Sequence, residues 1–345
     1  MSTPVPAPAP APAPAQASAG RPVGRRPVAR VGLSDQVFRG GLRVSGSAVL
    51  LVMLAVGSFL AYQAAHALRV GGFAFLTTQS WEPDAGRGHF GIAAVLTGTV
   101  LIGLLAVSLA LPMALCAALY ISEYAPRRLR QTLIALVDLM AAVPSVVYGL
   151  WGFFFLEQRM TGLARWISTY FGWIPLFKVD GADPHDPLAP VAAYTSSTFI
   201  AGTVVAFMIT PIMCSVMREV FGQAPAGERE GAYALGATRW GMIRSVVLPY
   251  GRGGIIGGTM LGLGRALGET ITVYMIISMV FAIQPHVLQS GASTVSALIA
   301  LHYGDSSPFG VSALMAAGLA LFLMTLAVNF AASAVVARSR SGAAS

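Results

Sequence analysis

The sequence predicts an all-α integral membrane protein that crosses the bilayer about six times. Its mean hydropathy is +0.69, and 55% of its 345 residues are hydrophobic while only 10% are charged. Soluble globular domains carry about 25% charged residues. Apolar stretches recur along the chain, and each is long enough to cross the roughly 30 Å hydrocarbon core of a bilayer as a helix. Composition and pattern together indicate a polytopic membrane protein.

The first 40 residues predict a disordered tail. Residues 1–20 alternate proline and alanine and lack the bulky side chains that build a core, and a basic segment follows them. Arg25-Arg26 could mimic a cleavable twin-arginine signal. The apolar stretch behind it is longer than the core of a signal peptide, so we reject that interpretation. We expect one membrane domain over residues 41–338 and a short C-terminal tail over 339–345.

Six windows are long and apolar enough to span the membrane. They cover residues 44–66, 92–119, 134–156, 192–217, 253–283 and 309–337. An even number of spans places both termini on one side. Sixteen basic residues fall on the side of the termini and five on the other, with Arg265 inside the membrane. The positive-inside rule therefore predicts cytoplasmic termini.

Several classes of site are excluded by residue content. The formal charge of +8 does not indicate nucleic-acid binding, because basic stripes interleaved with polar sequence are missing. Membrane topology explains the charge better. Cys116 and Cys214 lie in or beside apolar spans and predict no disulfide framework. No two of the five histidines have metal-ligand spacing, so we expect no metal. Lys178 is the only lysine and is not part of a phosphate-binding loop, so we expect no nucleotide or other cofactor on this chain and assign any ATP hydrolysis to another subunit.

The fifth window contains two charges near its middle, in the stretch GLGRALGET from Gly262 to Thr270. At 100° per residue along this helix, a single face of about 80° carries several glycines, both charges and a threonine. These residues are Gly254, Gly258, Gly262, Arg265, Glu269 and Thr272. The glycines would let a neighbouring helix approach closely. Arg265 and Glu269, at i and i+4, would touch on that face.

Two interpretations of this pair remain open. It could be a buried ion pair that joins two helices, although such a pair recovers its desolvation cost only with good geometry and further hydrogen bonds. It could instead be an oxyanion site, because a guanidinium stays charged in a dry cavity and its planar fork matches phosphate oxygens. Ionisable residues inside membranes are functional by default, which favours the second interpretation.

Other polar residues could complete a substrate path but are weaker candidates. They are Thr97 and Thr99 in the second window, Ser145 and Tyr148 after Pro144 in the third, and Thr195 in the fourth. Hydroxyl groups in membrane helices often bond backbone carbonyls, so each could equally be structural.

The loop between the fourth and fifth windows, residues 218–250, has helical periodicity of its own. We expect two short helices with Gly236 at the turn between them and Pro249 at the end of the second. Glu230-Gly231-Ala232, then Gly236, then Leu248-Pro249 at their spacings resemble the EAA loop of ATP-binding-cassette importer permeases. Gly231 departs mildly from the usual alanine. The resemblance implies that this loop docks on a cytoplasmic ATPase.

Three further motifs narrow the resemblance. Residues 122–126 (SEYAP), 142–149 (AVPSVVYG) and 264–270 (GRALGET) are similar to the phosphate-specific permeases of PstC type, and the similarity covers residues 40 to 335. The related PstA type carries a similar third motif. This resemblance implies a type I importer permease fold and transport roles for Arg265 and Glu269.

The same resemblance implies a location and a set of partners. We expect a multi-pass subunit of the bacterial inner membrane, surrounded by lipid and paired with a homologous PstA-type permease. Two PstB-type ATPase subunits and a PstS-type phosphate-binding protein would complete the importer. An importer for another oxyanion, sulfate or molybdate, is the nearest alternative. A membrane-embedded enzyme is a more distant one, since no nucleophile and base or metal cluster is evident.

Overall fold

A computed structural model of the chain describes residues 33–84, 89–183, 186 and 190–341. The first 32 residues of the expected tail and the last four of the chain lie outside this range. Residues 33–40, placed in that tail, belong to helix α1, Leu33–Gly71. The chain divides into two compact units, Met1–Met53 and Leu54–Ser345, and the division falls inside α1.

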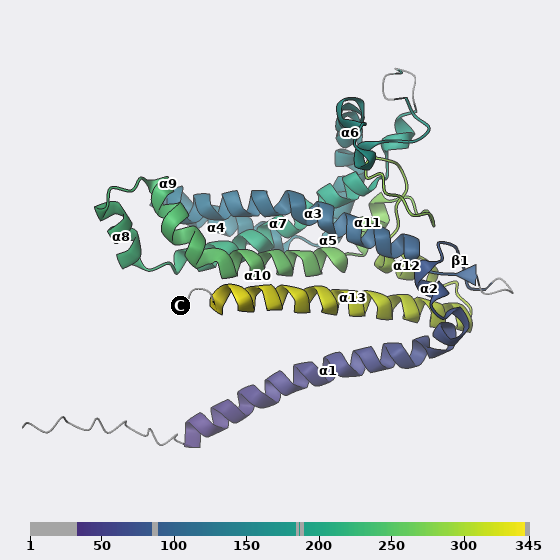
Figure 1. The fold of residues 1–345 in the computed structure, drawn as a ribbon, viewed down its shortest axis with the longest axis horizontal. Helices are drawn as coiled ribbons and strands as arrows, with labels where there is room; N and C mark the ends of the chain where they lie inside the picture. Colours follow the sequence, from purple (N-terminus) through teal and green to yellow (C-terminus); the bar gives the residue numbers. More distant parts are fainter. Residues whose placement is uncertain (1–32, 85–88, 184–185, 187–189, 342–345) are drawn as a thin grey trace, which may run out of the picture. The chain divides into compact units, whose positions relative to one another are not determined.

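Helices make up most of the described structure (Figure 1). After α1 come α2 (Ala74–Thr77), α3 (Ala93–Leu119), α4 (Arg127–Ala142), α5 (Ser145–Trp151), α6 (Glu157–Phe171), α7 (Thr198–Gly222), α8 (Ala226–Ala234), α9 (Arg239–Met242), α10 (Leu248–Leu267), α11 (Ile271–Ile276), α12 (Val295–His302) and α13 (Pro308–Ser341). Short π-helical segments η1 (Tyr120–Tyr124), η2 (Gly152–Leu156) and η5 (Ile243–Val247) and 3₁₀ turns η3 (Pro175–Phe177) and η4 (Val191–Tyr194) lie between them. Strands β1 (Trp81–Glu82) and β2 (His89–Phe90) form one antiparallel pair.

The all-α membrane class is confirmed, but not every expected window is one straight helix. Within the described residues, four helices are long and apolar enough to span a membrane, in α1, α3 with η1, α7 and α13. A fifth span results if the bent pair Arg127–Ala142 and Ser145–Phe171, which turns by 89°, counts as one. The turn lies at Pro144, which cannot donate a backbone hydrogen bond. The window at 253–283 is not one helix: α10 ends at Leu267 and the short α11 follows.

The core of the second unit is built on α7, which packs along α3 and α10 (Figure 1). One side of α3 carries alanine at every fourth position, and all four are fully buried: Ala106, Ala110, Ala114 and Ala118. On α7, a Cβ added at Gly202 would lie 2.5 Å from the side chain of Leu105. Small residues therefore bring these two helices close together, as is usual where lipid removes the hydrophobic drive for association.

Helix α10 meets α7 through glycine. Gly254, Gly258 and Gly262 are buried at four-residue intervals. A Cβ at Gly254 would lie 2.6 Å from Cβ of Val220, and one at Gly258 would lie 3.2 Å from the carbonyl oxygen of Met213. These three glycines, which we expected to admit a neighbouring helix, line the contact with α7.

The loop before α10 contains the two expected short helices. Gly236 separates α8 from α9 with φ of +82°, a conformation that favours glycine. The expected end of the second helix at Pro249 is wrong, because α9, η5 and α10 run on without a break from Arg239 to Leu267. Pro249 lies in the first turn of α10, directly after the π-helical turn, and a missing N–H is tolerated in a first turn.

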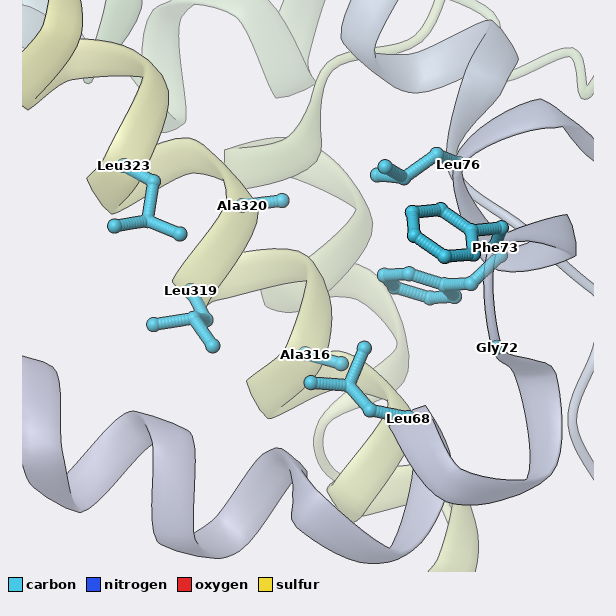
Figure 2. Close-up of a pocket in the computed structure, with 9 residues that line it drawn as sticks. Leu68, Gly72, Phe73, Leu76, Ala316, Leu319, Ala320 and Leu323 are labelled. Carbon is cyan, nitrogen blue, oxygen red and sulfur yellow. The ribbon is translucent and has the colours of Figure 1, made fainter.

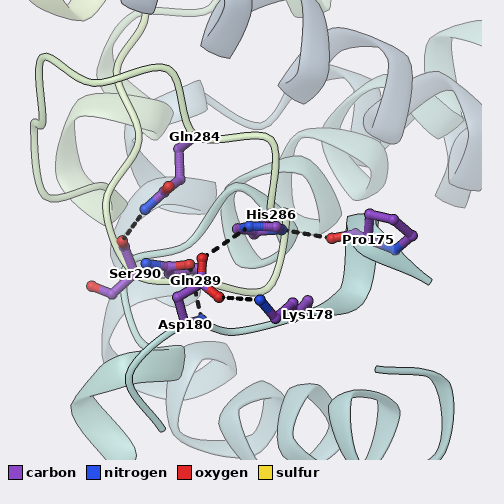
Figure 3. A network of polar contacts seen from close by, with 7 residues as sticks. All are labelled: Pro175, Lys178, Asp180, Gln284, His286, Gln289 and Ser290. Carbon is purple, nitrogen blue, oxygen red and sulfur yellow. Dashed lines mark hydrogen bonds and ion pairs between the residues drawn. The ribbon is translucent and has the colours of Figure 1, made fainter. Parts of the chain in front are cut away.

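A polar network joins the loop after α6 to the loop after α11 (Figure 3). Asp180 contacts Lys178 at 2.6 Å and Nε2 of His286 at 3.2 Å. Nδ1 of His286 lies 2.6 Å from the carbonyl oxygen of Pro175, and the backbone N–H of Asp180 donates to Gln289. The two loops are therefore held together by side chains rather than by packing alone.

Candidate functional site

The two charges of the fifth window lie on opposite sides of a helix break. α10 ends at Leu267, Gly268 caps it, and α11 begins at Ile271. Arg265 is thus in the last turn of α10, while Glu269 lies in the connection. The single helical face expected for both residues does not exist. In the part of the chain that the structure describes, Arg265 and Glu269 form no ion pair.

Glu269 is 9% exposed and caps the start of α11. Its Oε1 accepts from the backbone N–H of Thr272 at 3.2 Å and from the Thr272 hydroxyl at 2.9 Å. The hydroxyl of Ser296, on α12, donates to the backbone carbonyl of Glu269 at 2.9 Å. A side chain that accepts from the N–H three residues later satisfies a donor left open at a helix start. The break is therefore a defined structure rather than a frayed helix end.

The start of α5 approaches the same break. The hydroxyl of Thr272 lies 3.0 Å from the carbonyl oxygen of Ser145. A Cβ at Gly149 would lie 3.1 Å from Cα of Thr272, so α5 and α11 touch at their backbones. Three of the expected path residues, Glu269, Thr272 and Ser145, are brought together here.

Arg265 faces a separate cavity of about 500 Å³ between α7, α10 and α13. Ile212, Met260, Leu261, Gly264, Arg265 and Asn329 line it. Arg265 is exposed there, and no hydrogen bond joins its guanidinium to any other described residue. The cavity thus presents a cation with free donors beside an amide.

Asn329 was missed by the sequence reasoning. It is the only asparagine in the chain and lies within the last apolar helix, α13. Its Oδ1 would be 3.9 Å from a Cβ at Gly264, an ordinary contact distance, so Asn329 on α13 lies beside α10 at this point. A lone amide inside a membrane span could have flagged it, because polar side chains in spans usually face a partner or a cavity.

The weaker path candidates mostly bond backbone carbonyls. The hydroxyls of Thr97 and Thr195 donate to Ala93 and Ala192, and that of Tyr148 donates to Met140 at 3.0 Å. The hydroxyl of Thr99 donates to Val95, and its oxygen accepts from the N–H of Val295 at 3.1 Å. None of the four lines the Arg265 cavity. Thr195 lines another pocket, of about 380 Å³, beside the buried Glu157.

Two further hollows are apolar. One, of about 330 Å³, lies between the end of α1, α2 and α13 (Figure 2). Its lining residues include Leu68, Phe73, Leu76 and Leu323, and none of them is charged. The neighbouring hollow of about 610 Å³ shares Leu76, Ala320 and Leu323 and adds only Thr97 as a polar residue. An oxyanion would lose its hydration in either place without gaining a donor to replace it.

The loop with α8 and α9 presents apolar side chains that this chain does not cover. Leu235 is 91% exposed and Trp240 is 56% exposed. Glu230, Gly231 and Gly236 are also exposed, and Ala232 is half-buried. Leu248 and Pro249 continue into α10. Among the described residues, no three of the His, Cys, Asp and Glu side chains lie together as a metal site would need.

Residues 110–341 match the family of the binding-protein-dependent transport system inner membrane component. The chain belongs to this family. The match covers α7 to α13 together with the break at Gly268 to Thr270.

Curated relatives are similar over nearly the whole chain. The PstC 2 phosphate transport system permease protein of Mycobacterium tuberculosis is 38% identical over 315 residues, which is 91% of this chain and 94% of the relative. The PstC protein of Xylella fastidiosa strain Temecula1 is 35% identical over 86% of this chain and 88% of its own length. The expected resemblance to PstC-type permeases is confirmed.

Solved structures share the fold at low sequence identity. The inward-facing MetNI methionine ABC transporter matches with a TM-score of 0.51 and 14% identity, over 72% of this chain and 95% of that one. A bacterial ABC transporter involved in alginate import matches with a TM-score of 0.50 and 17% identity, over 87% and 99%. These structures show that the chain has an ABC importer permease fold. The family match and the curated relatives show that it is a transport permease of a membrane.

Proposed function

We propose that this chain is one of two permease subunits of an ATP-driven importer of inorganic phosphate. The sister permease would be of PstA type, two PstB-type ATPase subunits would bind from the cytoplasm, and a PstS-type protein would deliver phosphate from outside. The chain itself would bind no cofactor. The similarity to PstC permeases over about nine-tenths of the chain supports phosphate as the substrate.

The observation that carries the proposal is the unpaired guanidinium of Arg265 in its cavity. Arg265 keeps its fork of donors open because Glu269 is held elsewhere, by Thr272. A guanidinium can bind two phosphate oxygens at once, and it does so most strongly where water is scarce. Keeping a charged side chain in a membrane span costs about 2.5–3.5 kcal/mol, so a substrate role accounts for it better than packing does.

Glu269 would act next to the path rather than as a counter-ion of Arg265. Its carboxylate caps α11 and reaches Ser145 through Thr272, so it fixes the joint between α10, α11 and α5. A carboxylate can also accept from a protonated phosphate oxygen, whereas sulfate carries no such proton at neutral pH. Movement at the break would bring this acceptor to the cavity or withdraw it, as alternating access requires.

The exposed loop of α8 and α9 would be the contact with an ATPase subunit. Leu235 and Trp240 offer apolar surface in a short, otherwise polar loop, and large exposed apolar side chains mark interaction sites. The excess of basic residues on this side supports a cytoplasmic position for the loop and both termini.

The decisive experiment is transport by the assembled complex in lipid vesicles. We expect phosphate, delivered with its binding protein, to stimulate ATP hydrolysis and to accumulate, and we expect sulfate and molybdate at tenfold excess to compete weakly. If sulfate or molybdate drives ATP turnover instead, the chain belongs to an importer for that anion.

Coupling is tested at Gly236, whose positive φ disfavours any side chain. Gly236→Val should abolish uptake and weaken co-purification of the ATPase. Gly253→Val on α10, outside this loop and with nothing within 4 Å of an added Cβ, is the control. An uptake-competent Gly236→Val variant would contradict the docking role of this loop.

A further inference from the structure

The cytoplasmic-loop helix α8 is tied to the end of α3 by a buried ion pair. Nη1 of Arg229, on α8, lies 3.0 Å from Oε2 of Glu123, in the π-helical turn η1 that ends α3. The Glu123 side chain is 5% exposed and that of Arg229 is 22% exposed. Nη2 of Arg229 donates to the carbonyl oxygen of Phe221, at the end of α7, at 2.6 Å. One guanidinium therefore holds three helices.

The second helix of the loop, α9, contacts the same π-helical turn, η1. The guanidinium of Arg239, the first residue of α9, lies 5.2 Å from the ring centroid of Tyr124, next to Glu123. A cation over an aromatic face is attracted to it. Both α8 and α9 are thus attached to adjacent residues of η1, at the end of α3.

Each side chain of the Glu123–Arg229 pair retains one buried polar atom without a hydrogen bond. Oε1 of Glu123 and Nε of Arg229 are buried and have no hydrogen-bond partner among the residues that the structure describes. Buried polar groups are nearly always paired. If Nε and Nη2 turned onto the two carboxylate oxygens, both atoms would be paired, but the carbonyl of Phe221 would be released. The structure shows Arg229 shared between α3 and α7, and a bidentate arrangement on α3 alone would pair the two remaining atoms.

The far end of α3 reaches the segment that supports Glu269. Gly98 abuts this segment, since a Cβ there would lie 2.0 Å from the carbonyl oxygen of Ser293. Thr99 accepts from the N–H of Val295, and Ser296 donates to the carbonyl of Glu269. The stretch of α3 from Thr99 to its end at Leu119 spans about 30 Å as a helix and leads to η1.

We infer that the Glu123–Arg229 pair is the joint through which movement of α8 passes to α3, and through α3 to the helix break at Glu269. Glu123 and Arg229 are positioning residues: they touch no substrate, and they set how far a displaced loop moves the break. The inference rests on the proposed function for its transport consequence, but the mechanical link is a property of this chain alone.

The first test measures the link without any substrate. Hydrogen exchange is followed in the full-length chain in lipid nanodiscs, at peptides that contain Val295 and Thr272. Arg229→Gln should speed exchange there at least threefold, and Arg229→Lys, which keeps the charge but not the fork, should have a smaller effect. Arg244→Gln is the control, because Arg244 is exposed in the same loop and has no ion pair in the described range. Unchanged exchange in both Arg229 variants would overturn the inference.

A double-mutant cycle tests whether the two residues act together. Glu123→Gln combined with Arg229→Gln should change exchange no more than the larger single change. Additive effects would show that the residues act separately and would contradict a joint.

The transport consequence is measured in the assembled importer. Arg229→Gln should keep ATP hydrolysis within about threefold of wild type while phosphate uptake per ATP falls at least tenfold. Equal losses of both would point to failed ATPase docking and would overturn the joint. If wild-type vesicles take up no phosphate, the proposed function fails, and the exchange measurements still decide the inference.

Discussion

The hydroxyl of Thr272 lies between the carboxylate of Glu269, at 2.9 Å, and the backbone carbonyl of Ser145, at 3.0 Å. A hydroxyl has one proton to donate, so the two oxygens share it. Thr272 is fully buried, and its position joins the start of α11, the end of α10 and the start of α5. This hydroxyl therefore connects the break after Leu267 to the start of α5, next to the break at Pro144.

Removing the Thr272 hydroxyl should destabilise the helix break between α10 and α11, whereas a variant that keeps the hydroxyl should not. Thr272→Val keeps the shape but leaves Glu269 and Ser145 without this donor, and a hydrogen bond to a charged group contributes about 1.5–3 kcal/mol. We expect lower thermal stability by that amount and at least a tenfold loss of uptake. Thr272→Ser, which retains the hydroxyl, should stay within threefold of wild type. A valine variant with normal uptake would show that the contact is not used.

Arg265→Lys separates charge from geometry in the cavity. Lysine retains the positive charge but loses the planar fork that binds two oxygens at once. We expect phosphate uptake to fall at least tenfold, which corresponds to about 1.4 kcal/mol of lost interaction, with assembly unchanged. The same substitution at Arg252, exposed near the start of α10, is the control. Normal uptake in Arg265→Lys would exclude bidentate binding, and failed assembly would favour a packing role.

Sequence and structure agree where a local rule decides the backbone and differ where tertiary contacts decide it. The turn at Gly236 was predictable because glycine readily adopts a positive φ and this glycine lies between two stretches with helical periodicity. The glycines of α10 were predictable from their spacing. The break after Leu267 was not, since the apolar run continues through it and the capping contact of Glu269 depends on folding back onto Thr272.

The site shows the same division. Arg265 was identifiable as a charge in an apolar run, whatever its neighbours. Its separation from Glu269 was not, because helical angles apply only to an unbroken helix. Asn329 lies 64 positions from Arg265 in sequence, and only the packing of α13 on α10 places them in one cavity.

Substitutions of Asn329 should reduce phosphate uptake in two ways, by removing hydrogen-bonding groups from the Arg265 cavity or by changing its charge. Asn329→Leu removes one donor and acceptor, and we expect a loss of uptake of about threefold to tenfold. Asn329→Asp places a carboxylate in the cavity of Arg265, where it would compete with phosphate for the guanidinium, so a larger loss is expected. Ser333→Ala, one turn away on α13, is the control. If the aspartate variant transports better than the leucine variant, Asn329 does not face the anion path.

Two adjacent glycines of α10 should respond in opposite ways to the same change. A Cβ at Gly254 would lie 2.6 Å from Val220 on α7, whereas one at Gly253 meets nothing within 4 Å. Gly254→Ala should lower stability by about 1–3 kcal/mol because the helices must separate. Gly253→Ala should be neutral or stabilising by up to about 1 kcal/mol, since alanine favours helix. Thermal unfolding in detergent measures both, and equal effects would contradict the close contact seen here.

The network around Asp180 should depend on pH. The hydrogen bond from Lys178 is the main cause that holds the pKa of Asp180 below its ordinary value, and His286 adds to it. A lowered pKa means that the contacts persist at neutral pH and are lost only as pH falls through that lowered value, below about 4. We expect hydrogen exchange at residues 175–182 to be unaffected by Asp180 protonation between pH 5 and 8.

Asp180→Asn provides the comparison for this network. It removes the charge that binds both Lys178 and His286, so the loop after α6 should exchange faster than wild type throughout pH 5 to 8. Both ring nitrogens of His286 lie near oxygen atoms, Asp180 Oδ2 and the carbonyl of Pro175. His286→Gln should therefore also loosen this loop. Identical exchange in wild type and Asp180→Asn would show that the packing of the two loops, rather than this charge network, holds them together.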